Sequence, residues 1–138
     1  MWLLALLSCG PRPSKHLGVR LLVFVYGSLQ RGEEFHHYLT DGGARFIEAW
    51  RTPAQWEMWD LDGYPALTPG GETAIQGEVY EIDGPLLERL DVLEETPELY
   101  QRRALLTPHG EAYIYVVLEP PEDRVPIAAG RWSARPAS

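Results

Sequence analysis

The stretch LLVFVYGSLQRG, from Leu21 to Gly32, contains the sharpest change of character in this chain. Its first five residues are all apolar, and Tyr26, Gly27 and Ser28 then turn the sequence polar. A short run rich in β-branched and aromatic residues, followed by glycine, favours a strand that is buried on both faces. Beyond Tyr26 the backbone N–H groups leave the strand, and they are either satisfied within a local turn or free to bind an anionic ligand. Both interpretations of the turn are open at this point.

The length and composition of the chain predict a globular domain with a sizeable core. Apolar residues make up 45% and aromatic residues 11% of the 138 positions, which argues against extended disorder. The formal net charge of -8 argues against a nucleic-acid partner, because binding to phosphates requires basic patches. Small polar substrates and protein partners are the remaining classes. The single cysteine, Cys9, permits no internal disulfide, which fits a reducing compartment.

No metal site is predicted. A lone cysteine forms no metal cluster, and the adjacent histidines His36 and His37 would point about 100° apart on a helix. They could not both bind one ion from that element. We interpret them as surface or capping residues.

Residues 1–19 are predicted to be an N-terminal extension, disordered or remaining from a signal-like segment. The apolar run from Trp2 to Leu7 is followed by Cys9, in a pattern that loosely resembles a lipoprotein cleavage box. No Lys or Arg precedes the run, and it is too short for a signal-peptide core or a transmembrane segment. We therefore expect a domain at 20–132, a tail at 133–138 and a cytoplasmic protein, with an exported lipoprotein anchored through Cys9 as the alternative.

The order of the remaining elements predicts an α+β fold. We expect a small mixed, largely closed β-barrel of about six strands, with two or three flanking helices. Residues 66–71 are predicted to be loop, and Ile127 and Trp132 are expected to anchor the proline-rich C-terminal segment. After the opening strand, the pattern predicts a helix at 33–39, strands at 44–52, 54–61 and 74–82, a helix at 84–95, and a strand pair at 99–107 and 111–118.

The helix at 84–95, capped by Asp83, separates two neighbouring glutamates. At about 100° per residue, Glu94 falls within the apolar arc and Glu95 on the polar face. Burial beside leucines would raise the pKa of Glu94 towards the range of roughly 6 to 7 that suits proton transfer. Alternatively, Glu94 could reach solvent at the helix end or pair with a nearby arginine. The residues that define the arc are Leu86, Leu87, Leu90 and Leu93, and the two nearby arginines are Arg102 and Arg103.

Ser28 and Tyr100 are weaker candidates. The sequence YGSLQ lacks the G-x-S-x-G pattern of a nucleophilic serine, and no histidine is placed to activate Ser28. A role in the turn or in a hydrogen bond to substrate is therefore preferred for this serine. Tyr100 follows the helix closely enough to line the same pocket as Glu94.

Five segments together resemble the γ-glutamylcyclotransferase-like family, over nearly the whole chain from about Arg20 to Trp132. The spacing most resembles the short branch of this family, which includes γ-glutamylamine cyclotransferase. The order of the segments is more specific than any one of them. They are VYGSLQRG at Val25 to Gly32, GYPAL at Gly63 to Leu67, GEVYEI at Gly77 to Ile82, LDVLEETPELYQRR at Leu90 to Arg103, and AGRW at Ala129 to Trp132.

The resemblance implies a compact barrel in which the YGSL turn and the LDxxE glutamate face one pocket. Members of this family release 5-oxoproline from a γ-glutamyl compound when its α-amine attacks its own side-chain carbonyl. Mapped onto this sequence, Glu94 is the general acid/base, and no metal or organic cofactor is needed. The implied substrate-binding residues are Tyr26, Gly27, Ser28 and Leu29, with Tyr100 beside them.

The sequence departs from the family pattern at Glu95, where many members have glycine after the glutamate. This change is expected to alter the helix end and the pocket mouth. Two other functions are also considered: a non-catalytic domain that binds a small anionic metabolite, and a hydrolase that uses Ser28 and releases free glutamate. A domain that only binds anions would have no use for a buried carboxylate in its pocket.

Overall fold

The computed structural model describes residues 21–133, apart from 62, 97–98, 121 and 123–124. The predicted N-terminal extension with Cys9, and all but the first residue of the predicted 133–138 tail, lie outside the described residues. Within the described part of the chain, every helix is too short to cross a lipid bilayer.

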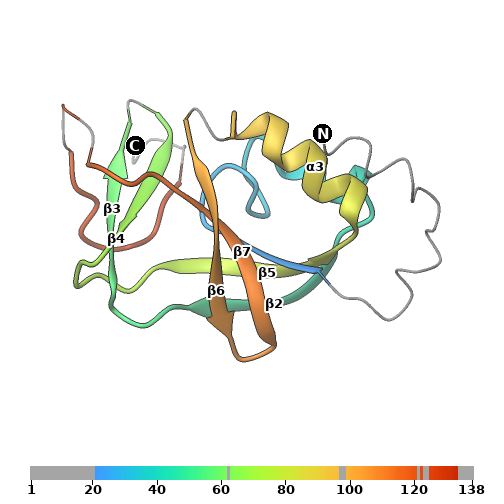
Figure 1. Cartoon of the computed structure of the whole chain (residues 1–138), viewed down its shortest axis with the longest axis horizontal. Helices are drawn as coiled ribbons and strands as arrows, with labels where there is room; N and C mark the ends of the chain where they lie inside the picture. The colour runs from blue at the N-terminus through green and yellow to red at the C-terminus, as the bar shows by residue number, and fades with distance from the viewer. Residues whose placement is uncertain (1–20, 62, 97–98, 121, 123–124, 134–138) are drawn as a thin grey trace.

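The strand β1 (Leu21–Val25) lies at the centre of a five-stranded sheet, as its apolar run predicted (Figure 1). It pairs antiparallel with β5 on one side and parallel with β7 on the other. The strands follow the order β2-β5-β1-β7-β6, with β2 at Arg45–Arg51, β5 at Gln76–Ile82, β6 at Gln101–Thr107 and β7 at Gly110–Val116.

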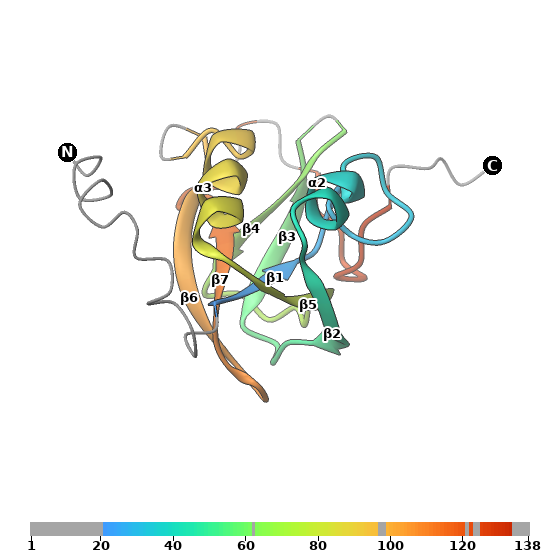
Figure 2. The ribbon, with the colours of Figure 1, turned by 90° about the vertical axis from the view of Figure 1, so that its right-hand side faces the viewer.

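Two helices lie on the same side of this sheet, α2 (His36–Asp41) and α3 (Gly84–Leu93) (Figure 2). The start of α3 is as predicted, because the Asp83 side chain accepts a hydrogen bond from the Leu86 N–H at 2.9 Å. The start of α2 is three residues later than predicted. The preceding residues are held in successive turns, including the bond from the Phe35 N–H to the Ser28 carbonyl.

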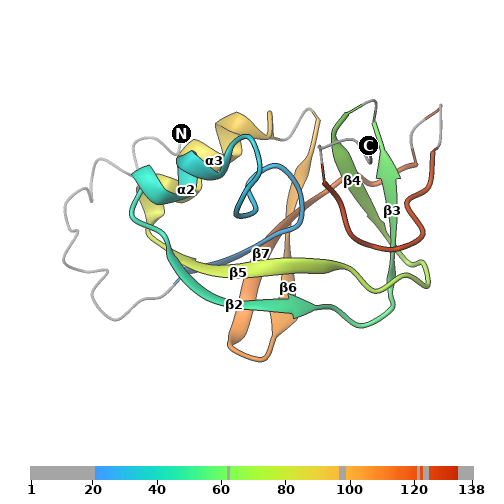
Figure 3. The same ribbon diagram turned by 180° about the vertical axis from the view of Figure 1, so that it is seen from behind.

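A separate hairpin stands at one end of the molecule, away from the helices (Figure 3). It consists of β3 (Trp56–Asp60) and β4 (Pro65–Pro69), so the prediction of a loop at 66–71 was wrong over most of its length. The prolines stand at the two ends of β4, where their missing N–H groups interrupt no interior position of the ladder. Proline at the ends of a buried strand was misread as a loop signal.

The α+β class is correct, but the sheet is not closed into the predicted barrel. In the described residues, the strands at the two ends of the sheet order, β2 and β6, are not paired with each other. The hairpin meets the main sheet through the bond from the Val117 N–H to the Leu67 carbonyl at 2.9 Å. Because helices cover one face and the hairpin the other, the sheet buries both faces without closing.

This arrangement explains the uninterrupted apolar run of β1. Leu22 and Phe24 pack in a cluster with the hairpin residues Met58 and Leu67. The alternating residues Val23 and Val25 pack on the opposite face in a cluster with the α3 leucines. The second cluster includes Leu86, Leu87 and Leu90. The strand is therefore held from both sides up to the point where the turn begins.

The C-terminal segment is anchored as predicted. Trp132 is buried, and Ile127 packs against the hairpin-side cluster. The Ile127 N–H also donates to the Met58 carbonyl at 2.8 Å, and the Gly130 carbonyl accepts from the Gln76 N–H at the same distance. This segment therefore runs back along the hairpin and the main sheet.

Candidate active site

A cavity of about 440 Å³ lies between the turn that follows β1 and the end of α3. In Figures 1 and 3 the turn passes between α3 and the hairpin. All six residues predicted for the site line this one cavity: Glu94, Tyr26, Gly27, Ser28, Leu29 and Tyr100. The remaining lining residues are Phe24, Val25, Phe35, Leu61, Tyr64, Pro65, Leu93, Glu95, Leu99 and Tyr115.

The carbonyl groups of the turn accept hydrogen bonds from within the protein, whereas three of its N–H groups donate none in the described residues. In the described residues, nothing accepts a hydrogen bond from the N–H of Gly27, Ser28 or Leu29. Consecutive N–H groups of this kind suit an anion. The carbonyls of the same three residues accept bonds at 2.9 to 3.0 Å from the Gln30 N–H, the Phe35 N–H and the His36 Nδ1, in that order.

Gly27 allows this turn to lie directly against the hairpin. A Cβ on Gly27 would stand 2.5 Å from Cγ of Pro65, closer than real Cβ contacts occur. Pro65 belongs to the GYPAL segment, which therefore has a definite place in the cavity wall. The two segments meet through a contact that only glycine permits.

Glu94 lies immediately after α3, where its backbone N–H still donates to the Leu90 carbonyl at 2.9 Å. Its position on the helical wheel is therefore kept, and its side chain is half-buried. Burial raises the pKa of Glu94 to about 7. In the described part of the chain, its carboxylate has no hydrogen-bond or ion-pair partner.

The alternative pairing of Glu94 with an arginine is not observed. Arg102 instead forms an ion pair with Asp91, one turn back on α3. Arg103 donates to the Gln101 side chain at 3.2 Å. Arg102 is paired with Asp91 and not with Glu94, so no ion pair in the described residues lowers the pKa of Glu94 and desolvation raises it.

Three tyrosines, Tyr26, Tyr100 and Tyr115, share the cavity with Glu94. Burial raises the pKa of each hydroxyl, and the nearby Glu94 carboxylate adds to each increase. The tyrosines are therefore neutral at physiological pH. Their hydroxyls donate within the protein to the Tyr115 carbonyl, the Pro65 carbonyl and the Asp91 carboxylate, respectively, at 2.6 to 2.7 Å.

Sequence reasoning missed Tyr115 and Tyr64 as lining residues. Tyr64 lies in the GYPAL segment and could have been found there. Tyr115 lies on β7, and an aromatic residue in a strand has no local signal that distinguishes a cavity wall from a core position. It becomes visible only when β7 pairs beside β1.

The described charged side chains that line the cavity are all acidic. The described lining residues include Glu94 and Glu95 but no lysine, arginine or histidine. A ligand carboxylate in this cavity would therefore depend on neutral donors, which are the backbone N–H groups of the turn and the hydroxyls of Ser28 and Tyr64. An ammonium group would find Glu94.

Glu95 has a backbone conformation that favours glycine. Its φ is +53°, and it is the one non-glycine residue with positive φ among those described. It stands directly after Glu94, the residue that caps α3, where helices commonly end with a left-handed glycine. The side chain is exposed at the cavity.

Neither Ser28 nor the histidines form a catalytic or metal-binding group in the described residues. No side chain there hydrogen-bonds to the Ser28 hydroxyl. His36 donates to the Leu29 carbonyl, and His37 is exposed. No three His, Cys, Asp or Glu side chains in the described part of the chain gather as ligands for one ion.

Fold and cavity together define a small α+β domain with an unpaired acid and free backbone donors in one apolar pocket. Residues 23–134 match the family described as "Gamma-glutamyl cyclotransferase, AIG2-like". The chain belongs to this family.

Relatives agree in sequence and structure. The chain is 34% identical over 113 residues to the gamma-glutamylcyclotransferase family protein YtfP of Escherichia coli K12, covering 82% of this chain and 96% of the relative. The solution structure of ytfP from E. coli superimposes with a TM-score of 0.68 at 31% identity, over 81% of this chain and 96% of the other. Gamma-glutamylaminecyclotransferase A of Danio rerio is 38% identical over 107 residues, covering 67% of this chain and 66% of the relative. A crystal structure of an aig2-like protein from Mus musculus has a TM-score of 0.70 at 26% identity, over 86% and 91% of the two chains.

Proposed function

We propose that this protein converts a small γ-glutamyl compound into 5-oxoproline and a free amine or amino acid, with Glu94 as general acid/base. The observation that supports this most directly is the unpaired Glu94 carboxylate, with a pKa of about 7, in the cavity that the turn also lines. Membership of the cyclotransferase family supports the reaction class.

The reaction begins with a proton transfer. The α-amine of the substrate is mostly protonated at neutral pH, and the ionised Glu94 accepts one proton from it. The freed amine attacks the γ-carbonyl carbon, which forms a five-membered ring and a tetrahedral oxyanion. The bond from that carbon to the leaving nitrogen then breaks, and Glu94 returns the proton to this nitrogen. The ring nitrogen, which still carries one proton too many after its attack, passes that proton through Glu94 to the released amine, which leaves as an ammonium ion. Atoms and charge balance without an oxidant, reductant or cofactor.

The turn would hold the substrate in the folded shape that ring closure requires. The free N–H groups of Gly27, Ser28 and Leu29 are suited to the α-carboxylate or the oxyanion, and one such donor is worth about 3 kcal/mol in a transition state. Tyr26 and Tyr100 supply neutral walls beside the ring. Ring closure is unimolecular, so positioning provides much of the rate.

A panel of γ-glutamyl amines, γ-glutamyl amino acids and glutathione tests this proposal. Each compound is incubated with the protein, and 5-oxoproline and free glutamate are both measured. We expect 5-oxoproline from at least one compound. Free glutamate that disappears with Ser28→Ala would instead establish hydrolysis, and binding without either product would establish a non-catalytic binding domain.

A further inference from the structure

Three of the segments that define the family resemblance meet at residues of the turn segment that lie outside the cavity described above. Gln30 comes from the turn segment, Glu78 from GEVYEI on β5, and Trp132 from the final AGRW. None of the three lines the cavity with Glu94. They line a separate cavity of about 270 Å³. The proposed reaction assigns them no role.

The side-chain amide of Gln30 binds three backbone carbonyls. Its Nε2 donates to the carbonyls of Tyr26 at 3.0 Å, Gly27 at 3.2 Å and Trp132 at 3.3 Å. An amide NH₂ has two hydrogens, so at least one of them is shared between two acceptors. One side chain thus connects the turn to the C-terminal segment.

With the bonds from Gln30, the carbonyl groups of the turn are all hydrogen-bonded, whereas three of its N–H groups are not in the described residues. With Gln30 in place, the carbonyls of all four residues from Tyr26 to Leu29 accept hydrogen bonds from within the protein. The N–H groups of the last three are left without acceptors in the described residues. The C=O and N–H of one peptide unit point in opposite directions, so fixing these carbonyls also fixes the directions of the N–H groups that follow them.

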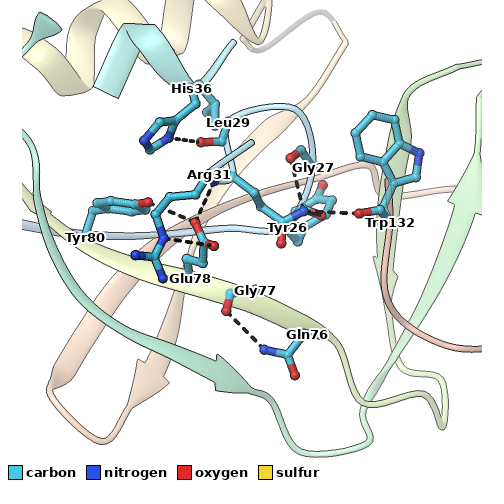
Figure 4. A network of polar contacts seen from close by, with 11 residues as sticks. Tyr26, Gly27, Leu29, Arg31, His36, Gln76, Gly77, Glu78, Tyr80 and Trp132 are labelled. Carbon is cyan, nitrogen blue, oxygen red and sulfur yellow. Dashed lines mark hydrogen bonds and ion pairs between the residues drawn. The ribbon is translucent and has the colours of Figure 1, made fainter. Parts of the chain in front are cut away.

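Glu78 fixes the next residue of the same segment. Its carboxylate accepts bonds from the Arg31 N–H at 3.0 Å and the Tyr80 hydroxyl at 2.9 Å, and the Arg31 Nε lies 3.7 Å away (Figure 4). The Glu78 side chain is only 13% exposed. The Arg31 guanidinium also lies 3.9 Å from the centroid of the Phe46 ring. The chain beyond Gln30 is therefore tied to β2 and β5.

We propose that Gln30 is a positioning residue that sets the N–H groups of Gly27, Ser28 and Leu29 to bind the α-carboxylate of the substrate. This rests on the proposed function. The carboxylate is assigned because no described lining residue of the cavity is a cation, and these three consecutive N–H groups form a set of neutral donors suited to a permanent negative charge. Gln30 acts through the turn and touches no reacting atom.

Gln30→Glu tests the assignment, because it keeps the shape and replaces the donor with an oxygen that faces carbonyls. A substrate from the active panel is used for steady-state kinetics. We expect KM to rise at least about tenfold while kcat changes by less than about threefold, since binding equal in ground and transition states affects KM. Gln30→Arg, which restores donors, should bring KM back towards the wild-type value.

Gln76→Glu is the matched control. Gln76 lines the same second cavity, and within the described residues its side chain donates only to the Gly77 carbonyl, at 3.4 Å. The substitution adds the same charge in the same region without touching the turn, so KM should stay within about twofold of wild type. An equal rise in KM in Gln76→Glu would overturn the assignment to Gln30, as would a fall in kcat at constant KM in Gln30→Glu.

A second measurement is independent of the reaction. Backbone ¹⁵N relaxation of the free protein reports the order of Gly27, Ser28 and Leu29, and order parameters below about 0.6 mark a flexible backbone. We expect all three to fall to that range in Gln30→Glu and to stay near 0.85 in Gln76→Glu. Unchanged order would refute the positioning role even if no γ-glutamyl compound were processed, whereas loss of order without turnover by wild type would count only against the proposed function.

Discussion

The two walls of the cavity are built in different ways. The turn wall, from Tyr26 to Leu29, has its carbonyls bound within the protein and presents neutral backbone donors. The helix wall presents Glu94, whose pKa burial raises to about 7. No described residue forms a hydrogen bond or ion pair with its carboxylate. Hydrogen bonds within the protein fix the geometry of the turn wall. The helix wall can transfer protons because its Glu94 carboxylate forms no such bonds in the described residues. Substitutions in the two walls should therefore affect different properties of the enzyme.

The largest effect is expected when the acid of the helix wall is removed. Glu94→Gln keeps the shape of the side chain but cannot accept the proton, so kcat should fall about 10²- to 10⁴-fold. KM should change little, because the turn wall is intact. Formation of 5-oxoproline from the active substrate measures both constants.

Glu95→Gln is the control for this substitution. The same chemical change is made one residue along, on an exposed side chain, and kcat should remain within about threefold of wild type. If Glu94→Gln retained full activity while Glu95→Gln lost it, the roles of the two glutamates would have to be exchanged.

The next largest effect is the pH dependence of kcat/KM. It should report on the helix wall, because Glu94 titrates near neutral pH and the backbone groups of the turn wall do not titrate. With a pKa of about 7, Glu94 loses its charge on acidification, and kcat/KM should fall about tenfold per unit well below pH 7. A profile that showed no loss between pH 7 and 5 would exclude Glu94 as the base.

The same ionisation affects stability with a definite sign. The folded-state pKa lies above the ordinary value of 4.5, so the folded protein binds the proton more tightly than the unfolded chain. This contribution is fully present below about pH 4.5 and is lost as pH rises through about 7. Relative to wild type, Glu94→Gln should therefore gain stability as pH rises across this range, measured by urea unfolding at several pH values.

A smaller effect is expected when the turn wall is displaced. Gly27→Ala places a methyl group 2.5 Å from Cγ of Pro65, and we expect about 1 to 3 kcal/mol of destabilisation with at least a tenfold loss in kcat/KM. The pH profile should keep its midpoint, because Glu94 is unchanged. Gly84→Ala is the control, since a Cβ there meets nothing within 4 Å, and it should leave kcat/KM unchanged.

The smallest effect concerns the residue beside the helix wall. Glu95→Gly relieves a left-handed conformation and should stabilise the protein by about 1 kcal/mol in thermal or urea unfolding. Glu95→Ala is the comparison, because alanine still has a Cβ and should gain little. Equal gains from both would attribute the effect to charge instead of backbone conformation.

The features that could be predicted were those with a local cause. The apolar run of β1 predicted a strand buried on both faces, and the wheel position of Glu94 predicted an environment that raises its pKa; both agree with the structure. The strand β4 was missed because Pro65 and Pro69 resemble turn residues until their places at the strand ends are known. The open sheet was missed because covering the faces by helices and a hairpin leaves no trace in the pattern of any single strand.

The carbonyl bonds of the turn could not be predicted for a related reason. Gln30, Glu78 and Trp132 lie far apart in sequence, and their polar atoms acquire partners only through tertiary contacts. A glutamine in a turn is ordinarily a surface residue. The resemblance to the family drew attention to the segments that contain these residues, but it did not show what they bind.

The parallel pairing of β1 with β7 has a consequence for when the cavity can exist. The hydroxyl of Tyr26 donates to the carbonyl of Tyr115, 89 positions later, so the turn and the strand beside it are joined by one of the longest sequence separations in the domain. Contacts of this kind slow folding, because the entropy of closing a long loop must be lost before they form. A nascent chain that ended before β7 would contain both Glu94 and the YGSL turn, yet it would lack the strand that closes the pocket around them. We therefore expect ligand binding to begin only after the C-terminal strands have docked.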